Sequence, residues 1–356
     1  MHRTQDGSII ARDGRTLFYS WPRFVTEICE GDHCFICGRS PQATAFNREH
    51  ILPNWLLHQF NLHGKSITLP NGQEHRYGTY RLPCCVDCNL ELGANFETPI
   101  STAVAQGFRG VDSLISREGP MRLFIWMALI FLKLHLKDGR LRMHLDQRLG
   151  EERIGDGYNW ETFHHLHSLA RSAHTQASID NRVAGSLVVM ELMDGGDPQV
   201  QFDFASVTAA QCLYLRLGDV AIFTVFDDAA ASVMGLENLI ARIDGPLAPL
   251  QAREFLAELA ACNLHLENRP RFGTRVTDGA KPTVDIEVFT DPASGPRFSP
   301  KDDAVVGHFK YDLLKYWVGQ ISVSPDAGRP EDLLQANGLS LLFDDEGQFI
   351  RHRQTP

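Results

Sequence analysis

Two pairs of cysteines, each with two residues between its members, most limit how this chain can fold. Cys34 and Cys37 form the first pair and Cys85 and Cys88 the second, in a chain with only eight cysteines. In a reducing compartment this spacing is typical of metal binding rather than of disulfides. Four thiolates complete a closed tetrahedral site, so the sequence predicts a structural zinc. Cys84 stays an alternative to Cys85, although the two-residue spacing to Cys88 favours Cys85.

The 47 residues between the pairs exceed what a simple zinc ribbon needs, so a further structure is expected inside this loop. The loop begins with FNREHILPNWLLHQF, residues 46–60, in which Glu49 and His50 are adjacent. Asn54 is placed to cap a short helix over the residues that follow it. Glu49 and His50 would face opposite ways on a regular strand, so they can share one site only if the strand bends.

A β-hairpin is predicted in the second part of the loop. Asn71-Gly72 is a strong turn signal between two candidate strands, the second of which is expected to lead into Cys85. Asn89 follows Cys88 directly and is expected to begin a helix. The predicted order is therefore cysteine pair, acid-histidine, hairpin, cysteine pair, asparagine and helix.

This order resembles the HNH, or ββα-metal, endonucleases in their zinc-stapled form. Those enzymes have C-x2-C, then Asp/Glu-His-Ile-x-Pro, then C-x2-C followed by His or Asn. The matching residues are Cys34, Cys37, Glu49-His50-Ile51-Leu52-Pro53, Cys85, Cys88 and Asn89. The resemblance covers roughly residues 30–98 and implies an N-terminal ββα-metal module, similar to a treble clef.

The resemblance also implies roles for individual residues. Glu49 and Asn89 would bind a catalytic divalent ion, Mg²⁺ or Mn²⁺, through oxygen atoms, and His50 would be the general base. A third ligand one helical turn after Asn89 would fall at Gly93, which has no side-chain donor, and Glu97 is the candidate substitute. The chain departs from the family where a middle asparagine usually orients the histidine. Tyr80 or a backbone carbonyl is left to orient His50.

The remaining sequence predicts a larger α+β domain. We expect a zinc-stapled nuclease domain over residues 1–118, with a connecting helix over 100–119, and a second domain over 119–356 for target recognition, oligomerisation or regulation. A buried helix is predicted over 121–137. Its apolar run of ten residues would rise only about 15 Å, which is too short to cross a membrane. Several strands are expected between 185 and 228, with a hairpin turn at 217–219.

The charge distribution bears on the partner. The net charge is -10, but the first hundred residues hold nine basic and ten acidic residues, so most of the excess acid lies elsewhere. A basic groove for nucleic acid, most simply double-stranded DNA, is therefore compatible with the cysteine-bearing region. With no secretory leader visible, we expect a cytoplasmic protein without a membrane partner and with possible homo-oligomers.

The preferred interpretation is a metal-dependent HNH endonuclease that hydrolyses phosphodiester bonds in DNA, by analogy a restriction or phage-defence enzyme. The alternative is a non-catalytic zinc-binding module for nucleic acid or protein, which would not need Glu49, His50 and Asn89 together. A third interpretation places the main activity in the C-terminal domain, where no group of residues supports it.

Overall fold

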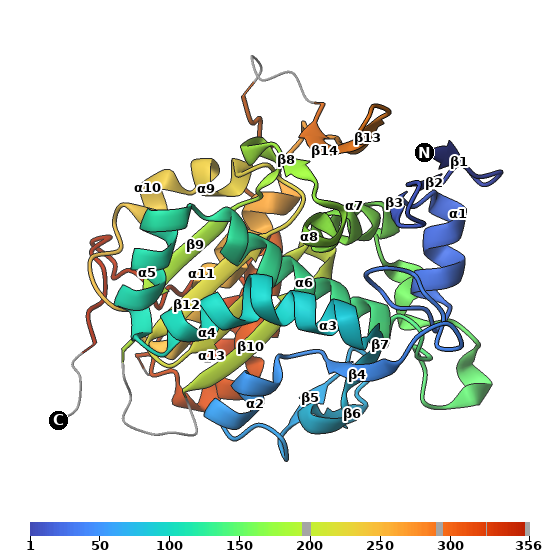
Figure 1. Cartoon of the computed structure of the whole chain (residues 1–356). Coiled ribbons are helices and arrows are strands. Elements are labelled where there is room, and N and C mark those ends of the chain that lie inside the picture. Colours follow the sequence, from blue (N-terminus) through green and yellow to red (C-terminus); the bar gives the residue numbers. More distant parts are fainter. Residues whose placement is uncertain (194–200, 290–294, 325, 353–356) are drawn as a thin grey trace. The chain divides into compact units, whose positions relative to one another are not determined.

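The computed structural model describes residues 1–193, 201–289, 295–324 and 326–352, and it confirms a mixed α+β protein (Figure 1). The chain forms two compact units that interleave along the sequence. The first unit comprises residues 1–103, 114–183 and 271–289, and the second comprises residues 104–113, 184–270 and 290–356. The functional division into a nuclease domain up to residue 118 and a second domain from residue 119 stays a prediction.

The first unit combines small sheets with helices. Its strands are β1 (His2–Arg3), β2 (Ile9–Ile10), β3 (Thr16–Phe18), β4 (Phe46–His50), β5 (Ser66–Thr68), β6 (Glu74–Arg76), β7 (Arg81–Cys85), β8 (Ser178–Ile179), β13 (Phe272–Thr277) and β14 (Thr283–Val288). Its main helical segments are α1 (Trp21–Arg23), η1 (Phe24–Cys29), α2 (Asn54–Gln59), α3 (Val86–Leu92), η3 (Gly93–Glu97), α6 (Met121–Asp138), α7 (Trp160–Ala170) and α8 (Ser172–Thr175). The strands pair as β1-β2-β3, β4-β7, β5-β6 and β13-β14-β8.

The pairing of β4 with β7 returns the chain from the inserted loop to the neighbourhood of the first cysteine pair. The two strands are antiparallel along their full length, from Phe46 opposite Cys85 to His50 opposite Arg81, and β7 leads directly into α3 (Figure 1). The predicted hairpin is confirmed as β5-β6, and its turn uses Gly72 at a φ of +79°. However, β6 ends at Arg76, so the strand that reaches Cys85 is the separate strand β7 and not the second hairpin strand.

Both predicted helix starts in this region were displaced. Helix α3 begins at Val86, because Cys85 is its N-cap and the Cys85 thiol accepts a hydrogen bond from the Cys88 amide. Asn89 therefore lies one turn inside the helix. Helix α2 likewise begins at Asn54 itself, whose side-chain oxygen lies 3.2 Å from His63 Nε2 rather than capping the helix.

The apolar helix predicted over residues 121–137 is confirmed as α6, and every residue from Leu123 to Leu136 is buried. Such burial within the protein is what a core helix with no polar face requires. Within the described residues, no single helix has the length and hydropathy to cross a membrane. Only the bent pair of α5 (Gly107–Glu118) and α6 meets these criteria together.

The connecting helix predicted over residues 100–119 is broken into α4 (Thr98–Val104) and α5. Gly107 adopts a φ of +66° at the break, and the backbone amide of Phe108 donates to the carboxylate of Asp219 at 3.2 Å. A Cβ atom on Gly107 would lie 2.7 Å from that carboxylate. The break therefore depends on a partner 111 residues away in the sequence, which helical periodicity cannot reveal.

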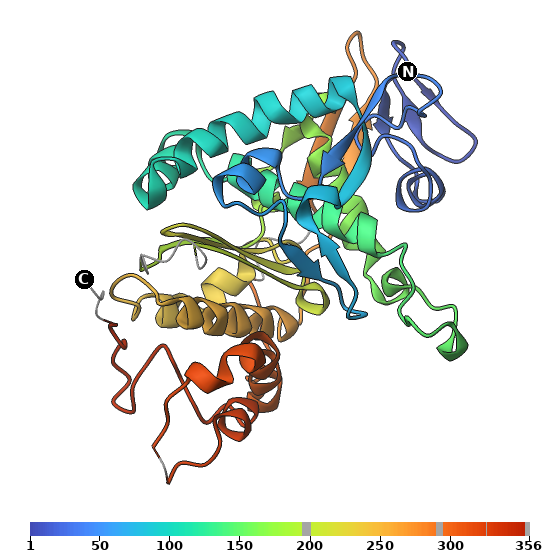
Figure 2. The same cartoon turned by 90° about the horizontal axis from the view of Figure 1, so that it is seen from below.

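The second unit is built on one antiparallel sheet with the order β10-β11-β12-β9. Its elements are β9 (Leu187–Glu191), β10 (Phe202–Val207), β11 (Cys212–Leu217), β12 (Val220–Val225), α9 (Ala231–Gly235), α10 (Glu237–Ile240), α11 (Pro249–Leu264), α12 (Asp303–Leu314) and α13 (Pro330–Gln335). The predicted turn between β11 and β12 is confirmed, with Gly218 at a φ of +67°. Figure 2 shows α11 between this sheet and the C-terminal helices, and the core on the α11 side of the sheet includes Cys212, Tyr214, Ala221 and Phe223. Every residue of β11 and β12 is buried.

Candidate metal centre and the residues around it

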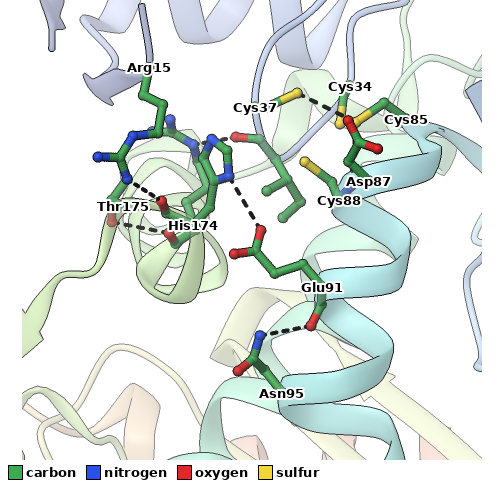
Figure 3. Close-up of polar contacts among 12 residues, drawn as sticks. Arg15, Cys34, Cys37, Cys85, Asp87, Cys88, Glu91, Asn95, His174 and Thr175 are labelled. Carbon is green, nitrogen blue, oxygen red and sulfur yellow. Dashed lines mark hydrogen bonds and ion pairs between the residues drawn. The ribbon is translucent and has the colours of Figure 1, made fainter. Parts of the chain in front are cut away.

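Four thiols of the first unit gather into one cluster. The sulfur atoms of Cys34, Cys37, Cys85 and Cys88 all lie within 4.8 Å of one another, and the Sγ atoms of Cys37 and Cys85 are 3.6 Å apart (Figure 3). Tetrahedral coordination with Zn–S bonds of about 2.3 Å places sulfur atoms about 3.8 Å apart. The donor type, number and spacing of this cluster are therefore compatible with a structural metal ion such as zinc.

Local backbone geometry presents both cysteine pairs. The first pair lies on a tight turn, in which the Gly38 amide donates to the Cys34 carbonyl at 2.9 Å and Gly38 adopts a φ of +74°. The turn is also held from α7, because His167 Nε2 lies 2.7 Å from the Phe35 carbonyl oxygen. The second pair lies at the junction of β7 and α3. Each sulfur is thus positioned by hydrogen-bonded backbone rather than by a flexible loop.

Cys84 lies beside this cluster without belonging to it. Its Sγ atom is buried and 3.9 Å from Cys34 Sγ, but the group of four mutually close sulfur atoms contains Cys85 instead. Cys84 precedes Cys85 on β7, where successive side chains face opposite sides of the strand. The geometry thus favours Cys85, in agreement with the sequence spacing.

Two arginines supply positive charge around the thiols. Arg39 points its guanidinium at the cluster, with Nε 3.4 Å from Cys37 Sγ and Nη2 3.6 Å from Cys85 Sγ. Arg171 is fully buried and donates to the backbone carbonyls of Ile36 and Thr16. Burial lowers the Arg171 pKa, and nearby anionic groups, including the cluster thiolates, oppose that shift. A divalent ion with four thiolates is net negative, so cationic side chains beside it are expected.

A second group of donors adjoins the cluster at Cys88. The ligand atoms of Cys88, Glu91 and His174 lie within 4.8 Å of one another, and His174 Nδ1 is 3.3 Å from a Glu91 carboxylate oxygen (Figure 3). Burial lowers the pKa of His174. The sequence reasoning missed both residues. Glu91 is recognisable in retrospect, since it follows Cys88 by three helical residues, whereas nothing in the sequence indicates His174.

Glu49, the predicted ligand of a catalytic ion, is buried at the end of β4. One carboxylate oxygen, Oε1, accepts a hydrogen bond of 2.8 Å from Lys133 Nζ of helix α6. The same ammonium donates to the His50 carbonyl at 2.9 Å. Lys133 therefore joins the acid-histidine pair to the core helix, a contact that the sequence reasoning did not anticipate.

His50, the predicted general base, is half-buried and has one nitrogen available. Its Nε2 atom is buried and has no hydrogen-bond partner among the described residues. Burial lowers the His50 pKa, a lowering to which Arg81 adds, and a backbone hydrogen bond with Gly78 acts in the opposite direction. The hydroxyl of Tyr80 has no partner among the described residues. Of the two orienting groups left open by the sequence, the backbone carbonyl is thus the one that contacts His50.

Asn89 and Glu97 lie on one continuous helical segment, α3 followed by η3. In a regular α-helix eight residues turn through about 800°, which leaves the second side chain about 80° away from the first. Segment η3 is a π-helical turn, which accommodates about one additional residue and reduces this offset. Burial, with a contribution from Glu49, raises the Glu97 pKa to about 7, whereas Lys133 lowers it. Glu97 thus lies within electrostatic range of the Glu49–Lys133 pair.

The oxygen donors are not gathered as closely as the thiols. Among the described residues, the groups of three or more close Cys, His, Asp or Glu ligand atoms include neither Glu49 nor Glu97. The Glu49 carboxylate is instead occupied by Lys133. The thiol cluster is thus already in the geometry of a metal site, whereas the oxygen donors would need to change partners to bind an ion.

Comparison with known proteins provides no further assignment. No protein-family model, no curated protein and no solved structure matches the chain significantly.

Proposed function

We propose that this protein is a metal-dependent HNH-type endonuclease that hydrolyses phosphodiester bonds in DNA in the cytoplasm. One observation carries the proposal: β4, which ends in Glu49-His50, pairs along its full length with β7, and β7 enters α3 at the four-thiol cluster. A structural zinc at this junction would fix two strands and a helix against one another. The acid-histidine pair would then have a rigid support, as a catalytic site requires.

In this proposal His50 takes the proton of the attacking water. Its Nε2 atom has no other hydrogen-bond partner among the described residues, and its lowered pKa keeps the imidazole neutral and able to accept a proton near pH 7. The contact with the Gly78 backbone orients the ring, and the carbonyl of Gly78 is itself held by Arg81 through bonds of 3.1 and 2.8 Å.

The catalytic ion would be held by oxygen atoms of Glu49, Asn89 and Glu97. Glu49 and the ionised form of Glu97, whose pKa burial raises to about 7, would supply carboxylate oxygens of the kind that Mg²⁺ and Mn²⁺ prefer. When bound, the ion supplies positive charge that stabilises the phosphate and the leaving oxygen.

Basic side chains near His50 favour a nucleic-acid substrate. Arg81 is directly opposite His50 in the strand pair, and the exposed Arg48 lies two residues before it, on the same face of β4. Lys65 and Arg76 add exposed positive charge on and beside the β5-β6 hairpin. Phosphate contacts of this kind position a duplex but carry little sequence information, so target choice would depend on other surfaces. A restriction or phage-defence role and homo-oligomer formation are compatible with this division of labour.

The test is cleavage of plasmid DNA by the purified, zinc-loaded protein with Mg²⁺ or Mn²⁺. We expect His50→Ala to lower the rate by about 10²- to 10⁴-fold, the usual contribution of a general base. His58→Ala, at an exposed position of the same loop, is the matched control and should cleave like the wild type. Zinc content and thermal stability should be unchanged in both variants. Wild-type cleavage by His50→Ala would refute the proposal.

One observation favours a second candidate, a non-catalytic zinc-binding module. Glu49 already has a buried partner in Lys133, as a scaffold residue would. This alternative predicts that the wild-type protein binds zinc and nucleic acid but cleaves neither DNA nor RNA at any Mg²⁺ or Mn²⁺ concentration. The plasmid experiment, repeated with single-stranded RNA, separates the two functions.

A further inference from the structure

Lys133 is an unusual residue in its surroundings. It is 2 % exposed, and its neighbours along α6 from Leu123 to Leu136 are all buried as well. An ammonium in such a place is costly unless hydrogen-bonded anions or carbonyls compensate it. Here it is compensated by the Glu49 carboxylate and the His50 carbonyl, the two groups that end β4.

Lys133 is held by few partners. An ammonium has three donors, and Lys133 uses two of them on acceptors among the described residues. One of these acceptors is the Glu49 carboxylate and the other is a neutral carbonyl. The neighbouring His50 Nε2 atom has no partner among the described residues. A cation that reaches Glu49 therefore competes with a single ammonium.

We propose that Lys133 is the internal cation of this site, holding Glu49 in the metal-free protein and competing with the divalent ion for the same carboxylate. This inference rests on the proposed function, because it takes Glu49 as a ligand of the catalytic ion. A divalent ion that reaches the Glu49 Oε1 atom must displace the ammonium from it. Lys133 would then be a positioning residue that limits metal affinity and keeps the acid-histidine pair ordered until metal and substrate arrive.

The test measures Mn²⁺ binding by electron paramagnetic resonance in the full-length, zinc-loaded protein. Lys133→Met removes the ammonium and keeps an apolar stem, so Mn²⁺ affinity should rise by about tenfold or more, since a like charge near a cation site disfavours binding. Lys137→Met is the matched control. That lysine is one turn further along α6, with Nζ 6.0 Å from the centre of the Tyr80 ring, and its removal should leave Mn²⁺ affinity unchanged.

Thermal stability gives a second readout that does not depend on cleavage. Lys133→Met leaves Glu49 buried without its counter-charge, so its melting temperature should fall without Mn²⁺ and recover when Mn²⁺ is added. The wild type and Lys137→Met should gain much less from Mn²⁺. If Lys133→Met fails to fold without Mn²⁺, refolding it with and without the ion measures the same effect. The double variant Glu49→Gln/Lys133→Met removes both charges, so it should fold without Mn²⁺ and show no such recovery.

Equal or weaker Mn²⁺ binding by Lys133→Met, or no binding by any variant, would overturn the inference. The nuclease function is tested separately by wild-type cleavage. If the wild type cleaves DNA but Lys133→Met binds Mn²⁺ no more tightly, only the role of Lys133 is lost. If Lys133→Met binds Mn²⁺ more tightly but the wild type does not cleave, the role of Lys133 stands and the nuclease function is lost.

Discussion

Each unit of this protein contains a buried lysine paired with glutamate, and the two arrangements differ in completeness. In the first unit, Lys133 contacts one carboxylate and one carbonyl. In the second unit, Lys310 of α12 contacts Glu254 at 2.8 Å, Glu258 at 3.5 Å and the Leu339 carbonyl at 3.3 Å. The lysines are equally buried, with exposed fractions of 2 % and 3 %. The chemical groups are thus the same, and the number of partners is what differs.

The network around Lys310 is satisfied at every end. One Glu254 oxygen accepts from the backbone amides of Leu341 and Leu342, and Glu258 also accepts from Lys301 at 2.7 Å. All three donors of Lys310 therefore have acceptors. A buried ionic network of this kind specifies one arrangement of helices and leaves no group free for a ligand.

This comparison suggests how to separate architectural from functional ion pairs within one chain. The sequence alone does not distinguish the lysine–glutamate pair of one unit from that of the other, and in the structure both pairs are buried. Lys133, however, has one carboxylate partner, and the neighbouring His50 Nε2 atom has no partner among the described residues, so a change of partner is possible there. The following experiments test this contrast, from the largest expected effect to the smallest.

The largest difference expected between the units is their dependence on metal. We predict about one zinc per chain and its loss in Cys88→Ser. Structural zinc contributes about 10–16 kcal/mol of apparent binding free energy, so the first unit should lose its fold without it. Hydrogen exchange with mass spectrometry should show lost protection in residues 1–103, while peptides from β11 and β12 stay protected.

The identity of the third ligand is tested by Cys84→Ala, which should retain zinc. Zinc loss in Cys84→Ala, together with zinc retention in Cys85→Ala, would make Cys84 the ligand.

The next test removes a charge from the complete network around Lys310 instead of from the incomplete one around Lys133. Lys310→Met leaves Glu254 and Glu258 buried without their shared counter-charge and should lower the free energy of unfolding by about 3–5 kcal/mol. Lys315→Met is the control, because this partly exposed lysine pairs with Asp312 of α12 at 3.1 Å and should contribute about 0–1 kcal/mol. Urea unfolding at pH 7 measures both. Mn²⁺ should not restore Lys310→Met, and such a recovery would remove the distinction from Lys133.

Features set by neighbouring residues could be predicted from the sequence. The cysteine pairs, the turn at Asn71-Gly72, the turn at Gly218 and the apolar helix α6 depend on spacing or on local composition, and the structure contains all of them. A helix start was predicted wrongly where a group other than the expected residue caps the helix. Asn89 is a good helix-start residue, but the Cys85 thiol accepts the Cys88 amide and begins α3 earlier.

The rest of the site depends on partners that are distant in the sequence. Lys133 reaches Glu49 across 84 residues, and Arg171 reaches the Ile36 carbonyl across 135. In the sequence Lys133 marks the end of an apolar run, so nothing there distinguishes it from a solvated lysine. Its contact with Glu49 depends on how α6 packs against β4, and only the tertiary structure determines that packing. The predicted roles of Glu49, His50, Asn89 and Glu97 stay predictions until cleavage and metal binding are measured.

The last expected effect, taken as a change in stability over one pH unit, concerns a buried aspartate in each unit. Asp138, at the end of α6, accepts a bond of 2.9 Å from Tyr158, and burial raises its pKa from 3.8 to about 7. Asp227 of the second unit is also mostly buried, but Arg269 and Asn263 bind it at 2.9 and 2.8 Å. The first unit thus again has the less complete set of partners.

Because the folded protein holds the Asp138 proton more tightly than the unfolded chain, this group stabilises the fold most at low pH. Its contribution is fully present below about pH 3.8 and is lost as pH rises through about 7. Asp138→Asn mimics the neutral carboxyl and can still accept the Tyr158 hydrogen bond. We expect the variant to match the wild type near pH 4 and to be more stable above pH 7. Between these pH values the difference in free energy of unfolding should grow by at most about 1.4 kcal/mol per pH unit.

Urea unfolding of both proteins at pH 5.5 and 6.5 measures this slope. Subtracting the wild-type value from that of the variant removes the titration of other groups. A pH-independent difference would show that the Asp138 carboxyl titrates alike in the folded and unfolded protein, so that burial does not raise its pKa.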